Sequence, residues 1–271
     1  MKALNSVLPV PMIDVRDLAF AYSGNPSLFD AFTWHVLRGE VWAILGRSGC
    51  GKSTLLTLLA GLLAPQKGEV WIGGSPLTRP RPRTGLILQD YGLLPWATVR
   101  ENVALGLEIR HFYGPDGRHA PEAIMAEDIR ARTAYWMRRL KLEAVADHYP
   151  GQISGGQRQR TAIARTLALE PDLLLMDEPF ASLDAPTREG LQELTLALSE
   201  EKAPTVVLVT HAIEEAAFMG QRILLLGEQP IGSPHIFENS HTVDPYYRHS
   251  RAYQEACALI RAGMEEQNAA A

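Results

Sequence analysis

The sequence predicts an α/β protein built on a mainly parallel β-sheet. Continuous apolar runs at 41–45, 173–177 and 205–210 are typical of parallel strands that are buried on both faces. A glycine-rich loop and a helical run at 53–63 follow the first of these strands, and a more polar, mainly helical region at 98–149 precedes the other two. Strands that alternate with helices in this order favour a parallel sheet, whose ligands bind at the carboxyl ends of the strands.

The remaining elements are expected on either side of this pattern. Residues 13–22 and 29–36 carry short β-type runs, and the second run alternates at Phe32, Trp34 and Val36. The apolar run GLILQ at 85–89 predicts a further strand.

Turn signals divide the helical region and the C-terminal part of the sequence. YGPDGRHAP at 113–121 breaks the helical region, and RILLLG at 222–227 predicts the last strand. From Glu228 onward, turn signals alternate with one weak helical run at 251–266, and the final NAAA is expected to be frayed. We find no internal repeat.

Composition excludes several classes of protein. The chain has 271 residues, a formal net charge of −5 and a pI near 5.9, which gives no overall attraction to nucleic acid. The two cysteines, Cys50 and Cys257, have no metal-binding spacing and indicate a reducing, cytoplasmic setting. We expect neither a secretory signal at the start nor a membrane span, because the most apolar stretch, 55–64, is too short.

A phosphate-binding loop is the most specific motif. GRSGCGKS at 46–53 fits the pattern G-x-x-x-x-G-K-[ST], with a strand before it and a helix after it. The glycines allow backbone N–H groups to surround phosphate oxygens, and the helix N-terminus favours negative charge there. Lys52 is expected to reach the β- and γ-phosphates and Ser53 to ligate Mg²⁺. The candidate nucleotide-binding residues are Gly46, Arg47, Ser48, Gly49, Cys50, Gly51, Lys52, Ser53 and Thr54.

Polar side chains at the ends of other strands complete a candidate catalytic site. Asp177 and Glu178 end the strand LLLMD; Asp177 is expected to hold Mg²⁺ and Glu178 to accept a proton from an attacking water. His211 ends the strand TVVLVT and can approach the γ-phosphate, while Gln89 ends a fourth strand and can contact metal and water. A strand running into a polar turn, or a structural histidine, is the alternative for each residue in isolation.

These residues together resemble the nucleotide-binding subunit of ATP-binding cassette (ABC) transporters. ISGGQ at 153–157 is similar to the signature sequence of that family, with Ile153 in place of the usual leucine. SLDA at 182–185, which includes Asp184, is similar to the D-loop, His211 to the switch histidine, and Gln89 to the Q-loop glutamine. Tyr22 matches the aromatic residue that stacks on adenine, although a strand-edge tyrosine remains the alternative.

The resemblance implies a split ATP site. Two cassettes pair head to tail, and each ATP lies between the phosphate loop of one chain and the signature of the other. Ser154, Gly155, Gly156 and Gln157 at a helix N-terminus would then bind the γ-phosphate of the partner's nucleotide. ATP and Mg²⁺ are the implied cofactors.

The family also implies an organisation and a location. A single P-loop domain over 1–271 is expected to contain a RecA-like core (about 1–90 and 160–230) with a small antiparallel β region, a helical subdomain (about 91–159) and a C-terminal extension (231–271). The implied partners are a second copy, transmembrane permease subunits and, indirectly, an extracytoplasmic solute-binding protein. The chain would lie peripherally on the cytoplasmic face of the cell membrane.

The segment DYGLLPWATVRENVALGLE at 90–108 resembles the nitrate, sulfonate and taurine branch of bacterial importers. Leu93 to Trp96 would form an apolar anchor for the permease, and packing within the helical subdomain is the alternative. The sequence cannot name the transported solute.

Other functions remain as rivals. An exporter, or an ABC ATPase of DNA repair or translation, would usually carry fused membrane spans, a second cassette or a long coiled coil. A P-loop GTPase or kinase does not explain ISGGQ, and no N-K-x-D guanine signature occurs.

Three departures from the family pattern stand out. Ala212 replaces the usual aspartate after the switch histidine, the stretch 110–132 is longer than usual, and nothing past Gly227 matches. Five further histidines have no spacing typical of a metal site, and we expect them on the surface: His111, His119, His235, His241 and His249.

Overall fold

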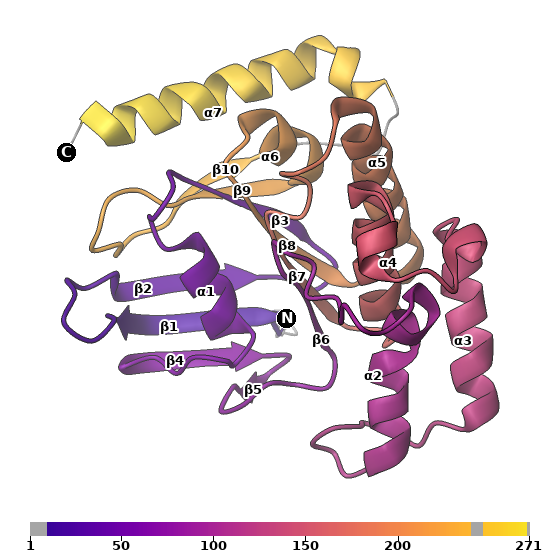
Figure 1. Ribbon diagram of the computed structural model, residues 1–271. Helices are drawn as coiled ribbons and strands as arrows, with labels where there is room; N and C mark the ends of the chain where they lie inside the picture. Colours follow the sequence, from indigo (N-terminus) through magenta and orange to yellow (C-terminus); the bar gives the residue numbers. More distant parts are fainter. Residues whose placement is uncertain (1–9, 240–245, 270–271) are drawn as a thin grey trace, which may run out of the picture.

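The computed structural model describes residues 10–239 and 246–269 and contains two β-sheets (Figure 1). The larger sheet has six strands in the order β10-β9-β3-β8-β7-β6. Its inner strands pair in parallel, and only β10 runs antiparallel to its neighbour β9. The strands are β3 (Val41–Leu45), β6 (Thr84–Ile87), β7 (Leu173–Asp177), β8 (Thr205–Thr210), β9 (Arg222–Leu225) and β10 (His235–Glu238).

The smaller sheet is antiparallel, with the strand order β2-β1-β4-β5. Helix α1 (Lys52–Leu59) lies between the two sheets, because it packs against β4 of one sheet and β7 and β8 of the other (Figure 1). The strands are β1 (Ile13–Phe20), β2 (Phe29–Val36), β4 (Lys67–Ile72) and β5 (Ser75–Pro76).

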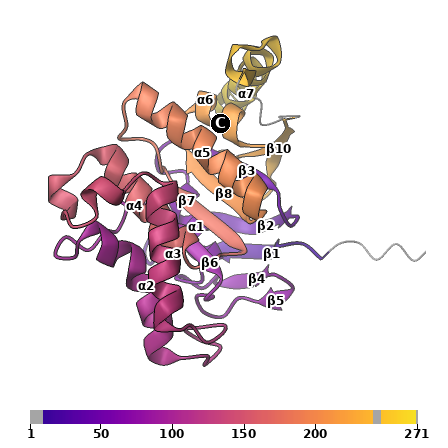
Figure 2. The ribbon, with the colours of Figure 1, turned by 90° about the vertical axis from the view of Figure 1, so that its right-hand side faces the viewer.

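Helices α4 and α6 pack against the opposite face of the six-stranded sheet. Helices α2 and α3 form a pair that extends away from the sheets, and α7 runs along the far side of α6 (Figures 1 and 2). The helices are α2 (Val99–Tyr113), α3 (Ala126–Arg139), α4 (Gly155–Leu167), α5 (Ala185–Lys202), α6 (Ile213–Met219) and α7 (Arg251–Ala269), with 3-10 turns η1 (Glu143–Val145), η2 (Pro150–Gln152) and η3 (Tyr247–His249).

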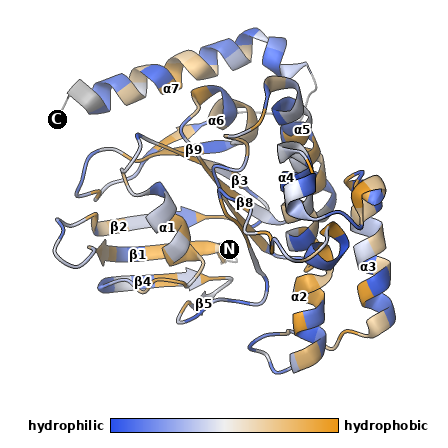
Figure 3. Ribbon diagram, in the orientation of Figure 1, coloured by the Kyte–Doolittle hydropathy of each residue, from blue (hydrophilic) through white to orange (hydrophobic). Residues whose placement is uncertain are grey.

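Alternation along the central strands creates two hydrophobic cores. On β3, Trp42 and Ile44 face α1 and the small sheet, whereas Val41, Ala43 and Leu45 face the layer of helices. All five residues of β3 are buried, which explains why this strand reads as an unbroken apolar run. Figure 3 shows the same apolar character running through the centre of the molecule.

The predicted fold class is confirmed, two predicted strand ends are wrong, and some strands were not predicted. The strand expected at 85–89 pairs with β7 only as far as Ile87, so Gln89 lies in the turn beyond the strand. Tyr22 likewise follows the end of β1. Strands β4 and β10 were not expected, because most of their residues are exposed and give no clear periodicity.

The C-terminal extension folds back onto the core. After β9 the chain adds β10 to the sheet, and α7 then packs against α6. His111, His235 and His249 are exposed and His119 is half-buried, whereas His241 lies outside the described residues. Within 10–239 and 246–269, no group of three or more His, Cys, Asp or Glu side chains is arranged to hold a metal, and no helix is long and apolar enough to cross a bilayer.

Candidate functional site

The phosphate loop joins β3 to α1 and bends back on its own lysine. Lys52 is only 5% exposed, and its Nζ donates to the carbonyl oxygens of Gly46 (2.9 Å) and Arg47 (2.8 Å). An ammonium group has three N–H donors, so one remains for an anion. Gly51 has a φ of +109°, which glycine adopts without strain, and this allows the chain to enter α1 directly.

Ser53 and Asp177 meet across the edge of the sheet. The Ser53 hydroxyl, in the first turn of α1, donates to Asp177 Oδ1 at the end of β7 over 3.0 Å. Burial raises the pKa of the Asp177 carboxyl, an effect that the Ser53 hydrogen bond opposes. A half-buried carboxylate and a hydroxyl in contact form a set of hard oxygen donors, the type that Mg²⁺ prefers.

Glu178 and His211 form a second pair at the same edge. Glu178 has a left-handed backbone, with φ of +42°, and its N–H donates to Val209 O at 3.0 Å. This conformation is unfavourable for a residue with a Cβ and is typical of functional sites. It directs Glu178 Oε2 to 3.2 Å from Nδ1 of His211, which follows β8.

Tyr22 lies over the start of α1. Its hydroxyl is 3.1 Å from Thr54 Oγ1, and its ring is 47% exposed. Tyr22 lines an open cavity of 400 Å³ together with Leu28, Ser53 and Thr54. An exposed aromatic ring at the rim of a phosphate loop can stack on a nucleotide base.

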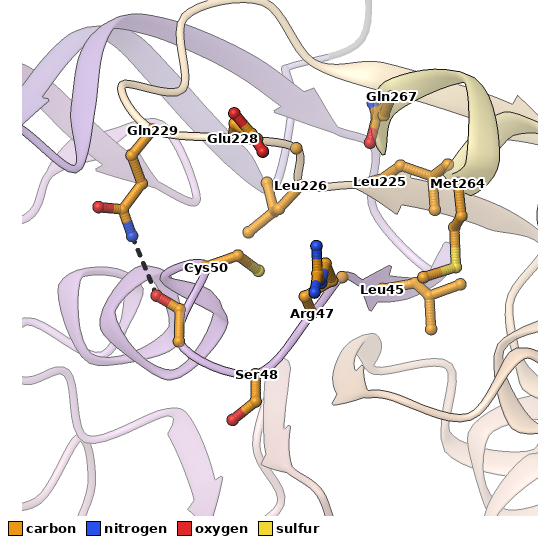
Figure 4. A pocket seen from close by; sticks show the side chains of 13 residues that line it. Leu45, Arg47, Ser48, Cys50, Leu225, Leu226, Glu228, Gln229, Met264 and Gln267 are labelled. Carbon is orange, nitrogen blue, oxygen red and sulfur yellow. Dashed lines mark hydrogen bonds between the residues drawn. The ribbon is translucent and has the colours of Figure 1, made fainter. Parts of the chain in front are cut away.

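Gln229 is a further residue of this region that the sequence analysis missed. It lines the same cavity as Tyr22, and its Nε2 donates to the carbonyl of Gly49 in the phosphate loop at 3.0 Å (Figure 4). On the other side of the loop, Cys50, Leu226 and Met264 line a second cavity of 320 Å³. No local motif surrounds Gln229, and only the folded chain brings it to a loop 180 positions away.

The signature residues form the N-terminus of α4. Ser154 Oγ accepts from the N–H of Gln157 at 3.2 Å, and Gln157 Oε1 accepts from the N–H of Ser154 at 2.9 Å. This capping box uses the first and fourth of these N–H groups, so the N–H groups of Gly155 and Gly156 have no partner within the helix. A Cβ on Gly156 would lie 2.6 Å from Thr187 Cγ2, so α4 can approach α5 this closely only with glycine there.

The structure does not bring every predicted residue to the phosphate loop. No residue of 154–157 lines the cavity beside Tyr22; α4 packs on α2, α3 and β6, whereas α1 packs on β4, β7 and β8. Asp184 caps α5 by accepting from the N–H of Thr187 at 3.0 Å, which lowers the pKa of its carboxyl. Within the described residues, the exposed side chain of Gln89 makes no hydrogen bond.

The residues present fit a magnesium nucleotide. A buried lysine with a free donor, a glycine loop at a helix N-terminus and an aromatic side chain at the rim suit phosphates joined to a base. Ser53 and Asp177 supply oxygen atoms suited to Mg²⁺.

Comparison with known proteins identifies the family. The family model described as ABC transporter matches residues 29–181. The chain belongs to the ABC transporter ATP-binding family. Among curated ABC proteins, it is 40% identical over 220 residues to the taurine import ATP-binding protein TauB of Yersinia pestis bv. Antiqua, covering 81% of each chain. It is 36% identical over 233 residues to the aliphatic sulfonates import ATP-binding protein SsuB of Bacillus cereus, covering 86% of each.

Solved structures of ABC cassettes show the same fold. A dimeric ATP-binding cassette in a post-hydrolysis state bound to ADP and Pi is 31% identical, with a TM-score of 0.71, and covers 85% of this chain and 100% of that one. The cbiO1 protein of Clostridium perfringens has a TM-score of 0.72 over 93% of this chain and 99% of that one. At 24% identity, this second likeness shows the fold alone.

Proposed function

We propose that this chain is the ATP-binding and ATP-hydrolysing subunit of a bacterial ABC importer for a small anion of the sulfonate, taurine or nitrate type. The observation that carries the ATPase assignment is the contact of Ser53, in the phosphate loop, with Asp177 at the tip of β7. This contact joins a phosphate-binding element to an acidic strand end at one point, which suits a magnesium nucleotide.

Each side chain of the site has a distinct task in hydrolysis. Lys52 would hold the β- and γ-phosphates, and Tyr22 would stack on the base. Glu178 would accept the proton of the attacking water, with His211 close to the γ-phosphate and in contact with Glu178. Ser53 and Asp177 would hold Mg²⁺, with Gln89 reaching it after a movement of its turn. Bound there, Mg²⁺ would neutralise the charge that develops on the phosphate oxygens.

A second copy of the chain would complete each site. The N–H groups of Gly155 and Gly156 have no partner within α4, and they suit the γ-phosphate of a nucleotide on another chain. Asp184 would act from the D-loop at the same interface. We propose the domain division expected from the sequence, with α4 crossing the limit at 159 between the helical subdomain and the core.

Transport would require permease subunits in the cytoplasmic membrane and, indirectly, a solute-binding protein. Trp96, which is 74% exposed just before α2, is the side chain best placed for a permease contact, whereas Leu93 packs against the core. The similarity to taurine and sulfonate import subunits supports the choice of solute class.

Two measurements test this function. The purified chain should release phosphate from ATP only with Mg²⁺, and Lys52→Ala should lose both nucleotide binding and turnover. Expressed with its permease and binding protein in cells that lack taurine, sulfonate and nitrate uptake, it should restore the uptake of one of these anions. Hydrolysis without uptake of any of them would reject the solute class but keep the ATPase assignment.

A further inference from the structure

The C-terminal extension is fastened to the helix that follows the switch histidine. The hydroxyl of Tyr253 donates to the carbonyl oxygen of Glu214 at 3.1 Å, and the guanidinium of Arg248 lies 3.5 Å from the ring centroid of Phe218. Asn239 Nδ2 donates to the carbonyls of Ala217 and Gly220 at the other end of α6. The extension therefore contacts α6 at both ends of the helix.

From Arg248, a chain of hydrogen bonds leads into the switch loop. Arg248 donates to Gln192 Oε1 on α5, and Gln192 Nε2 donates to Glu215 Oε1 on α6 at 3.2 Å. The Thr210 hydroxyl, at the end of β8, donates to Glu215 Oε2. Thr210 Oγ1 in turn accepts from the N–H of Ala212 at 3.0 Å. This hydrogen-bond network therefore reaches Thr210 and Ala212, the residues on either side of His211.

The middle of this hydrogen-bond network is buried, while Arg248 at its outer end is half-buried. Gln192 and Thr210 are each 1% exposed and Glu215 is 6% exposed. A buried polar group that loses its partner incurs its full desolvation cost, because water cannot replace the partner. Only one orientation of the Gln192 amide presents its oxygen to Arg248 and its nitrogen to Glu215. Arg248 therefore sets the amide orientation on which the Glu215 contact depends.

The start of α6 has no side-chain cap. Ala212 is the N-cap residue of α6 and has no side-chain capping bond, since alanine carries no hydrogen-bond acceptor in its side chain. The backbone N–H of Ala212 relies on Thr210 instead. The buried chain takes over the fixing of the turn that carries His211.

We propose that Arg248 is a positioning residue for ATP hydrolysis, which acts on the switch loop through Gln192 and Glu215. The C-terminal extension would then help to position the ATPase site, and substitutions in the extension would alter the rate of ATP hydrolysis. This inference rests on the proposed ATPase function and on the place of His211 in it.

The first experiment compares two arginines of the same segment in the full-length chain. Arg248→Ala removes the outer hydrogen bond of the network. Arg251→Ala is its control, because the Arg251 side chain is 91% exposed and, within 10–239 and 246–269, its one ion pair is with Glu255. Deuterium exchange of the peptide covering 210–216 should rise in Arg248→Ala and not in the control. For Arg248→Ala, kcat should fall by about tenfold while KM stays within about twofold, since the phosphate loop is untouched.

A second experiment moves the buried carboxylate between α5 and α6 while the side chains keep their shape. Gln192→Glu places two carboxylates face to face and should raise exchange at 210–216 and lower kcat. The double variant Gln192→Glu/Glu215→Gln restores a full set of partners. Its carboxylate on α5 would accept from Arg248 and from the new amide on α6, and the oxygen of that amide would still accept from Thr210. The double variant should recover most of the exchange protection and of kcat.

These experiments distinguish a failure of the Arg248 proposal from a failure of the ATPase assignment. Wild-type exchange and kcat in Arg248→Ala would overturn the proposal, as would a double variant no better than Gln192→Glu. If Arg248→Ala melts too low to assay, the Gln192 and Glu215 variants decide alone. Failure of the wild-type chain to hydrolyse ATP would instead reject the proposed function, and the exchange comparison would still show whether Arg248 holds the loop.

Discussion

Glu178 Oε2 lies 3.2 Å from Nδ1 of His211, so the two candidate catalytic side chains are in contact. Residues in contact have effects that do not add, because removing either one already breaks their joint arrangement.

The first prediction follows from this pair. Glu178→Gln should keep ATP binding and lower hydrolysis by about 10² or more, because the amide preserves shape but cannot accept the proton. His211→Ala should also lower the rate of hydrolysis. The rate of the double variant should be only slightly below that of the less active single variant. Phosphate release and fluorescent-nucleotide binding check both points. Fully additive losses would contradict a joint role.

The second prediction concerns the N-terminus of α4. Gly155→Glu fits within the chain, since the nearest atom to an added Cβ is Leu183 Cδ2 at 3.6 Å. On a Glu178→Gln background, it should leave ATP binding intact and block ATP-induced dimers, because the carboxylate would repel the partner's γ-phosphate. Light scattering measures the dimer, and Gly151→Glu, at an open position, is the control. Loss of ATP affinity in the monomer would place the signature in its own chain's site.

The third prediction concerns the exposed side chain of Trp96. Trp96→Ala should spare the fold and basal ATPase of the isolated chain, and weaken its retention on membranes that contain the permease. Phe112→Ala is the matched control, because Phe112 is 82% exposed near the other end of α2. A fall in circular dichroism or basal hydrolysis would show that Trp96 serves internal packing.

The fourth prediction concerns pH and Glu215. Burial raises the pKa of this carboxyl, and the hydrogen bonds from Thr210 and Gln192 oppose the rise. A pKa raised in the folded state means that stability is greatest below the usual glutamate value and falls as pH rises through the raised value.

Glu215→Gln removes this loss. Its free energy of unfolding, minus that of wild type, should be larger at about pH 8 than at about pH 5, because only the wild type loses stability as pH rises. Urea titrations at both pH values measure the difference, and exposed Glu214→Gln controls for the loss of one negative charge. A difference independent of pH would show that the Glu215 carboxylate carries no burial penalty.

The sequence predicts those parts of the molecule whose residues sit in one kind of environment. Strands β3, β7 and β8 are almost wholly buried, so their apolar runs were unmistakable. Strand β4 has only two buried residues, Val70 and Ile72, and β10 has none, so neither produced a pattern. The run at 85–89 stayed apolar past Ile87, and only pairing with β7 decides where the strand ends.

The site divides in the same way. The phosphate loop and the neighbouring acids Asp177 and Glu178 are local motifs, so the sequence alone could single them out as candidates. The contacts of Gln229 with Gly49 and of Arg248 with Gln192 join residues far apart in the chain. Nothing in their sequence neighbourhoods reports such contacts, since they arise only when segments far apart in the chain pack together.

Strand β10 also has a protective effect. It covers the outer edge of β9, whose backbone N–H and C=O groups would otherwise face solvent. A chain cut at Leu226, directly after β9, would expose that edge next to an apolar core. Open edges of this kind recruit strands from other molecules. The shortened protein should therefore aggregate even though every catalytic motif is still present.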